Sequence, residues 1–163
     1  MKYEEFIKLF QTKVNSLSKG KQLDLAVSVC KRLLPDYQQF YIENNWWNPV
    51  ILLYSIKICE LFKGNEASLE LVKEMLPKVN EIIPDTEDFR NATYALNASA
   101  AVYETLEYLI DNDKIHIFNI GIYLTDTIDF KVQEEDELTQ QQIDNHPKMI
   151  EVHKYLVEGE IKQ

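Results

Sequence analysis

Apolar residues spaced three and four positions apart recur along nearly the whole chain, and this spacing constrains the fold more than any other feature. The first stripe consists of Tyr3, Phe6, Ile7, Phe10, Val14 and Leu17. Such a stripe gives a helix one apolar face, which other helices must cover. No segment has the alternation and turn spacing of a sheet, although the β-branched run 115–122 leaves a strand open there. The chain is therefore predicted to be all-α.

Turn and capping residues divide the pattern into nine helical segments, and the chain is predicted to be a bundle of about seven to eight helices. The predicted segments are 3–17, 22–34, 35–43, 49–62, 65 or 68 to 83, 87–110, 113–129, a short helix after Thr139 and a last helix after Pro147. Pro35 is predicted to end one helix, and Pro77 to kink or restart another. The pattern continues across residue 82, so the prediction is one α-helical domain over residues 1–163.

The segment 87–110 is predicted to be the longest helix and the centre of the bundle. Asp85 to Asp88 supply a capping residue and first-turn acids before it. Small residues allow neighbouring helices to approach closely along this segment, namely Ala92, Ala95, Ala98, Ser99, Ala100 and Ala101.

The net charge of −10 is concentrated in the second half of the chain. Residues 1–82 hold 11 basic and 10 acidic side chains, whereas residues 83–163 hold 6 basic and 17 acidic ones. This excess argues against binding a nucleic-acid backbone, which needs a cationic surface. It fits a basic protein partner, which the later helices would meet with an acidic face.

The remaining composition favours a cytoplasmic protein. The N-terminus MKYEEFIKLF has neither the basic n-region nor the apolar h-region of a secretory signal. Apolar runs such as Val50–Tyr54 are far shorter than the roughly 20 residues of a membrane span. Cys30 and Cys59 lie in apolar helical contexts, so we expect buried, reduced thiols, and nothing favours a disulfide between them.

No catalytic or cofactor motif is present in the sequence. The chain has 4 glycines, and they form neither a phosphate-binding loop nor a GxSxG elbow. Asp113 and His116 form a single Asp-x-x-His pair, interpreted as a helix cap and a surface or packing histidine. His146 and His153 are separated by Pro147, so they are not expected to share a metal ion. The sequence therefore predicts no catalytic, cofactor or metal site.

Carboxylate pairs are interpreted mainly as solvated helix surfaces. They occur at Glu104–Glu107, at Asp126–Asp129 and in the acid run 134–137. Glu104 is the exception to inspect, because it lies in the long small-residue helix. If it faces inward, it needs a partner such as Arg32 or Arg90.

Two groups of residues are candidates for binding a partner. The first is the aromatic group Tyr41, Trp46 and Trp47, in which adjacent tryptophans cannot both enter the core, so one is expected to be half exposed. The second is the acid run Glu134, Glu135, Asp136 and Glu137.

Three segments resemble, in matching order, the YjaG-like bacterial family of uncharacterised function, of the DUF416 type. They are a Cys-x-Arg-x-x-Pro-x-Tyr-x-x-Phe pattern at 30–40, an Ile-Pro-x-x-x-Asp-Phe pattern at 83–89, and an acidic segment with Asn-His-Pro at 137–158. The residues that carry the first two motifs are Cys30, Arg32, Pro35, Tyr37, Pro84 and Phe89. The resemblance implies an all-α cytosolic protein, carries no catalytic residue, and suggests a link to signalling through histidine kinases. Pro77 and the tryptophan pair depart from that family's pattern.

Three classes of function remain open at this point. The preferred one is a non-catalytic protein–protein interaction module, either an immunity protein that neutralises a basic toxin or a regulator of a signalling protein. The second is a small-molecule or enzymatic site inside the bundle, using Arg32, Glu104 or His116. The third is a structural homodimer with the tryptophan pair at its interface.

Overall fold

The computed structural model describes residues 1–87, 89 and 91–159, with the backbone alone for Glu135. Within these residues the chain forms eight α-helices and no strand, which confirms the all-α prediction. The helices are α1 (Tyr3–Ser16), α2 (Lys19–Asn44), α3 (Val50–Lys63), α4 (Leu69–Glu81), α5 (Ala92–Asp111), α6 (Lys114–Glu135), α7 (Gln140–Asp144) and α8 (Pro147–Glu158). The β-branched run 115–122 belongs to α6, so the alternative of a strand is wrong.

Side-chain caps fix where several helices begin. The hydroxyls of Ser18, Ser68 and Thr139 accept hydrogen bonds from backbone amides of the first turns of α2, α4 and α7. The Asp113 carboxylate caps α6 by accepting from the Ile115 amide at 3.0 Å, as the sequence predicted. Pro147 opens α8, where its missing amide hydrogen is not needed.

The two prolines that were predicted to interrupt helices lie inside continuous ones. α2 runs through Pro35 and α4 runs through Pro77, so the predicted separate helix 35–43 is the second half of α2. Both prolines are exposed. The carbonyls that lose their helical donors belong to Lys31 and Lys73, which are exposed as well, so the break in bonding falls on the solvent side.

α5 begins at Ala92 and not near Glu87 as predicted. The prediction that it is the longest helix is wrong, since it has 20 residues and α2 has 26. Asp85 does cap, but it caps a turn, because its carboxylate accepts from the Glu87 amide at 3.0 Å. Asp88, the last residue of the predicted helix start, lies outside the described residues.

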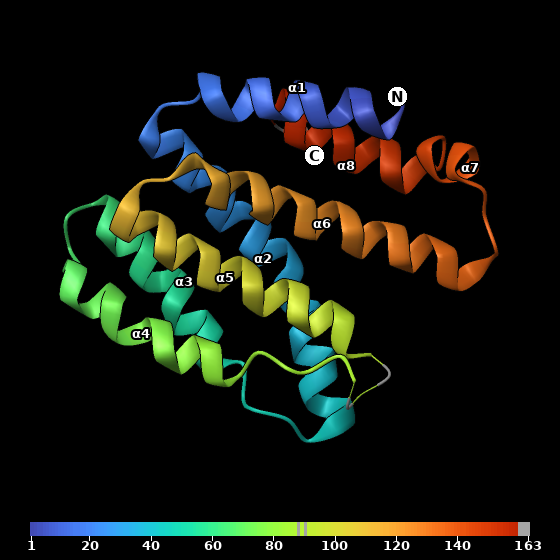
Figure 1. Ribbon diagram of the computed structural model, residues 1–163. Helices are drawn as coiled ribbons and strands as arrows, with labels where there is room; N and C mark the ends of the chain where they lie inside the picture. Colours follow the sequence, from blue (N-terminus) through green and yellow to red (C-terminus); the bar gives the residue numbers. More distant parts are fainter. Residues whose placement is uncertain (88, 90, 160–163) are drawn as a thin grey trace.

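α5 occupies the centre of the bundle, where it contacts α2, α3, α4 and α6. Figure 1 shows α1 and α8 packed beside α6 on one side and α3 and α4 on the other. Ala92, Ala95, Ala98 and Ala101 of α5 are almost fully buried. Their small side chains let the neighbouring helices approach, as the sequence indicated.

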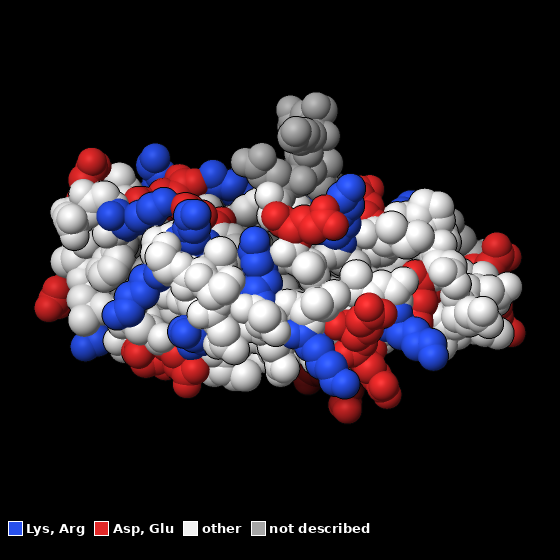
Figure 2. All heavy atoms as spheres, turned by 90° about the horizontal axis from the view of Figure 1, so that it is seen from above, with Lys and Arg blue, Asp and Glu red and all other residues white. Residues whose placement is uncertain are grey.

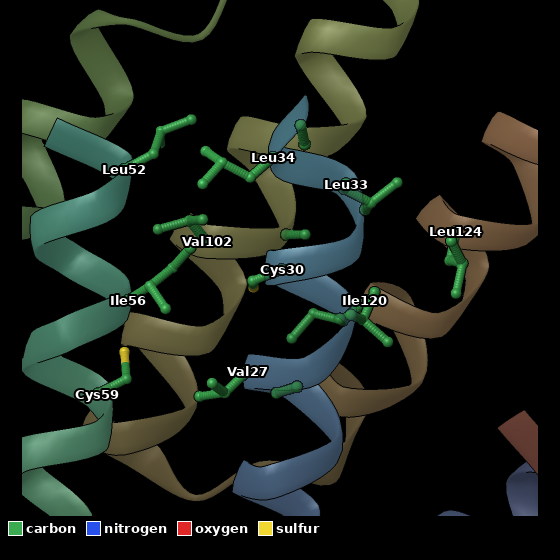
Figure 3. Close-up of a cluster of buried hydrophobic side chains, with 14 of the residues drawn as sticks. Val27, Cys30, Leu33, Leu34, Leu52, Ile56, Cys59, Val102, Ile120 and Leu124 are labelled. Carbon is green, nitrogen blue, oxygen red and sulfur yellow. The ribbon is translucent and has the colours of Figure 1, made fainter. Parts of the chain in front are cut away.

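The core joins apolar side chains from α2, α3, α5 and α6 (Figure 3). Cys30 and Cys59 belong to this core, and both are buried free thiols. The Cys30 Sγ lies 3.2 Å from the Thr105 hydroxyl. Burial raises the pKa of the Cys30 thiol to about 12, which makes it a packing residue and a poor nucleophile.

Among the described helices, none combines the length and the apolar character that crossing a bilayer requires.

Candidate functional site

The two adjacent tryptophans point in different directions. Trp46 is partly buried and packs edge-on against Phe40 and Phe89, with ring centroids 6.0 and 5.1 Å away. Its indole Nε1–H donates to the Ile82 carbonyl at 3.1 Å. Trp47 has 56% of its surface exposed. One ring therefore stabilises the fold, and the other is presented to solvent.

An apolar face on α3 follows directly after Trp47. Val50, Leu53 and Tyr54 are 55%, 46% and 52% exposed, and their spacing of three and four residues puts them on one side of the helix. The opposite side of α3 enters the core through Leu52, Ser55, Ile56 and Cys59. We call Trp47, Val50, Leu53 and Tyr54 the α3 surface.

The sequence contained a signal for this surface. A helix that is apolar on all sides is normally covered on all sides. α3 is apolar on both faces, but it packs on α2, α4 and α5 from one side. Contiguous exposed apolar groups of this kind mark interaction sites more often than scattered ones do.

The other predicted partner-binding residues lie elsewhere. Tyr41 is partly buried on α2. Glu134 and Glu135 end α6, and Asp136 and Glu137 follow it in an exposed loop; the Glu135 side chain lies outside the described residues. In Figure 1 this end of α6 lies well apart from α3. The aromatic group and the acid run therefore do not form one surface.

The acidic face that was expected on the later helices is not uniform, because the side that carries α8 also carries basic side chains (Figure 2). Figure 2 shows the side of α1 and α8, where basic and acidic side chains are interspersed. Arg32 contributes to this mixing, because it pairs with Glu151 of α8 at 2.8 Å and lies over the Tyr155 ring.

A polar cluster forms where α5 and α6 meet at their shared turn. The His116 Nδ1 pairs with Glu104 Oε2 and lies 3.6 Å from Glu107 Oε2. On the other side of the ring, Nε2 lies 2.9 Å from Asp111 Oδ2. The Asn119 amide donates to Glu104 Oε1 at 3.2 Å. We call Glu104, Glu107 and His116, with Asp111 and Asn119, the α5–α6 cluster.

The cluster is largely shielded from solvent. The His116 and Glu104 side chains are 13% and 15% exposed. Although partial burial lowers the pKa of His116, its hydrogen bonds to Asp111 and Glu104 and their charges raise it overall above the ordinary value. Burial, together with the charges of Glu104 and Asp111, raises the pKa of the Glu107 carboxyl.

The partner of Glu104 differs from the one that the sequence suggested. Its partner is His116, whereas Arg32 pairs with Glu151, and Arg90 lies outside the described residues. The sequence held a usable signal. In an antiparallel pair of helices with a turn near residue 112, positions equally far from the turn face each other, and these are 107 with 116 and 104 with 119.

The other two histidines have separate roles. The His146 Nδ1 accepts from the Lys148 amide at 3.2 Å and so caps α8. His153 is buried and stacks on Phe6 with a centroid distance of 4.0 Å.

The family-like residues are structural. The Tyr37 hydroxyl donates to the Ile82 carbonyl at 2.7 Å, and Phe89 packs against Phe40 and Trp46. Pro84 is buried, and Pro35 is exposed inside α2. These contacts hold the connection between α4 and α5 against the end of α2.

A hollow of about 850 Å³ lies between the N-terminus and α7, lined by residues 1–4, 140, 141, 144 and 145. Its lining includes none of Arg32, Glu104 and His116, so it does not provide the internal polar pocket that an enzymatic site in the bundle would need.

These observations define a single-domain all-α bundle with two unusual places, the α3 surface and the α5–α6 cluster. Residues 9–158 match the family described as "Protein of unknown function (DUF416)". The chain therefore belongs to the DUF416 family, which confirms the resemblance seen in the sequence.

A crystal structure of a DUF416 family protein from Shewanella baltica OS155 has the same fold. It superposes with a TM-score of 0.76 at 19% sequence identity, covering 90% of this chain and 81% of that one. No curated protein matches this chain.

Proposed function

We propose that this chain is a non-catalytic protein–protein interaction module of the cytoplasm and that the α3 surface is its contact. The observation that carries the proposal is the row Val50, Leu53 and Tyr54, which continues from Trp47 and is about half exposed. An indole and a phenol ring among aliphatic side chains is the composition of interface hot spots.

The position of the surface favours one kind of partner over another. The α3 surface lies in the near-neutral half of the chain, apart from the acid run, so an apolar contact would drive binding. A regulator that docks on an apolar helix of a signalling protein fits this surface better than an immunity protein led by charge to a basic toxin. A second copy of the chain is the alternative occupant.

A charge placed in the α3 surface tests the proposal. Leu53→Glu should reduce capture of the native partner at least about tenfold, because a carboxylate would be desolvated at the contact. Ile150→Glu is the matched control, since Ile150 of α8 is 50% exposed and lies outside the surface. Neither change should alter the free energy of unfolding by more than about 0.5 kcal/mol, since both sites are exposed.

Sedimentation of the same variants distinguishes a different protein partner from a second copy of the chain. A concentration-dependent dimer that Leu53→Glu abolishes would assign the surface to a homodimer. Binding that survives Leu53→Glu but is lost on reversing the charges of Glu134 and Glu137 would contradict the proposal and place the contact on the acid run.

A further inference from the structure

The α5–α6 cluster brings an imidazole and two carboxylates from different helices to one point. His116 comes from the first turn of α6, and Glu104 and Glu107 lie one turn apart on α5. We propose that Glu104, Glu107 and His116 bind a divalent transition-metal ion of the zinc type. Mixed imidazole and carboxylate donors are the set that such ions prefer over Mg²⁺ or Ca²⁺, which favour oxygen alone.

The geometry is close to that of a bound site. One donor atom from each of the three residues lies within 4.8 Å of the other two. Donors about 2.1 Å from a shared ion lie at most about 4.2 Å apart. Because His116 Nδ1 and Glu104 Oε2 pair directly, side-chain rotations would have to part these two atoms to admit an ion, while Glu107 Oε2, 3.6 Å from Nδ1, already lies at a distance that two ligands of one ion can have.

Two residues outside the donor set orient it. Asp111 faces the far nitrogen of the His116 ring, with Oδ2 2.9 Å from Nε2. An ion that displaces the Nδ1 proton would leave the Nε2 proton directed at Asp111, and the freed Nδ1 lone pair would then face the ion. A metal-binding histidine characteristically donates its other ring nitrogen to a carboxylate in this way. Asn119 holds Glu104 Oε1 and leaves Oε2 toward the shared centre.

The charge balance also points to a cation. Glu104, Glu107 and Asp111 surround a single imidazole, while the lysine and arginine ion pairs found in the described residues involve other acids. Even when His116 is protonated, one imidazolium leaves these three carboxylates with excess negative charge around it, of which only Glu104 is largely buried. A divalent ion would balance it better than a proton on His116.

The site would leave coordination positions for water. Glu107 is 35% exposed, so the cluster opens to solvent on its side. Three protein donors with an open position are characteristic of exchangeable sites, whereas structural zinc sites use four protein donors. The proposal is independent of the α3 surface, which lies on a different helix.

Calorimetric titration of the full chain with ZnCl₂ alone tests the proposal. We expect one zinc ion per chain, and MgCl₂ should bind at least about tenfold more weakly. Glu107→Gln and His116→Gln should each weaken zinc binding at least about tenfold through loss of a donor. Asp111→Asn should weaken it about tenfold by releasing the orientation of the ring.

Glu70→Gln is the matched control, because Glu70 is an exposed acid in the first turn of α4. It should leave zinc affinity unchanged. Circular dichroism checks folding, and Asp111→Asn keeps the test decisive if His116→Gln unfolds, since the Asp111 side chain is 51% exposed. Absence of saturable zinc binding would overturn the proposal. So would binding that persists in Glu107→Gln and Asp111→Asn, and the cluster would then be an ion-pair network only.

Discussion

His116 and His153 belong to the same bundle but have opposite surroundings. Both ring nitrogens of His116 face carboxylates. His153 of α8 is 2% exposed, stacks on Phe6 and has no hydrogen-bond partner for either nitrogen among the described residues. Burial lowers the pKa of His153 to about 4, whereas carboxylates raise that of His116.

The difference separates a packing role from a binding role. A histidine without polar partners behaves as an aromatic filler, and its proton is disfavoured. A histidine held by carboxylates is ready to exchange its proton for another cation. Phe6 and Phe10 of α1, Phe118 of α6 and His153 of α8 stack on one another, and we call them the apolar layer. This layer and the α5–α6 cluster should therefore respond differently to substitutions and to pH.

The largest expected loss of stability comes from a substitution that disrupts packing in the apolar layer around His153. In Gly121→Ala, the new Cβ would lie 2.3 Å from ring atoms of Phe10, which is fully buried and stacks on Phe6. We expect a loss of about 3 kcal/mol in the free energy of unfolding, measured with urea.

Gly20→Ala is the control for this change. The nearest atom to its new Cβ is the flexible Lys63 Cε at 3.8 Å, and Gly20 is helical. This variant should gain about 0.5 kcal/mol from the lower entropy of the unfolded chain. Equal stabilisation by both changes would show that helix propensity, which favours Ala over Gly, and not the contact with Phe10, decides the outcome.

A smaller effect comes from pH acting on His153. The folded state holds its pKa near 4, and the unfolded chain has about 6.5, so the unfolded state binds more protons between these values. The stability due to neutral His153 is complete above pH 6.5 and is lost as pH falls toward 4. Between pH 8 and pH 5 we expect a loss of about 2 kcal/mol.

The variant His153→Leu should remove this part of the pH dependence. The difference between wild type and variant isolates His153 from all other titrating groups, and Asp144, whose charge favours the histidine proton, is present in both proteins. Identical pH profiles of the two proteins would mean that His153 finds a polar partner when protonated.

The smallest expected change in stability concerns the α5–α6 cluster. Glu107→Gln removes a carboxylate whose charged form is disfavoured by burial and by its acidic neighbours. Without added metal, at pH 7, this variant should be more stable by a few tenths of a kcal/mol, because Glu107 is partly exposed and screened. Urea unfolding without zinc measures this gain in the free energy of unfolding. With zinc the order should reverse, since zinc should stabilise wild type more than the variant.

Most of the fold could be predicted from local patterns. Apolar spacing and caps such as Ser68, Asp113 and Thr139 report on single helices, and these predictions agree with the structure. The predicted helix end at Pro35 and the predicted restart at Pro77 are wrong because an exposed proline leaves its unpaired carbonyl partner to solvent, and exposure depends on how the helices pack.

The candidate sites could be predicted only in part. Trp46 and Trp47 are equivalent in sequence, and only the Ile82 carbonyl and the Phe89 ring make one of them a core residue. The sequence singles out Glu104 as an unusual acid and suggests Arg32 or Arg90 as its partner, but its pairing with His116 depends on the register of α5 against α6. The apolar pattern within a single helix does not determine this register.

The Ile82 carbonyl accepts from both Tyr37 and Trp46, at 2.7 and 3.1 Å. One backbone oxygen thus ties the end of α2, the loop before α3 and the exit of α4 into a single unit of cooperative unfolding. The residue next to Trp47 is anchored to the core, because the Trp46 indole donates to this carbonyl and packs against Phe40 and Phe89. A partner that covers Trp47 would therefore lose little conformational entropy at this point, and the loop is pre-organised for fast, reversible recognition.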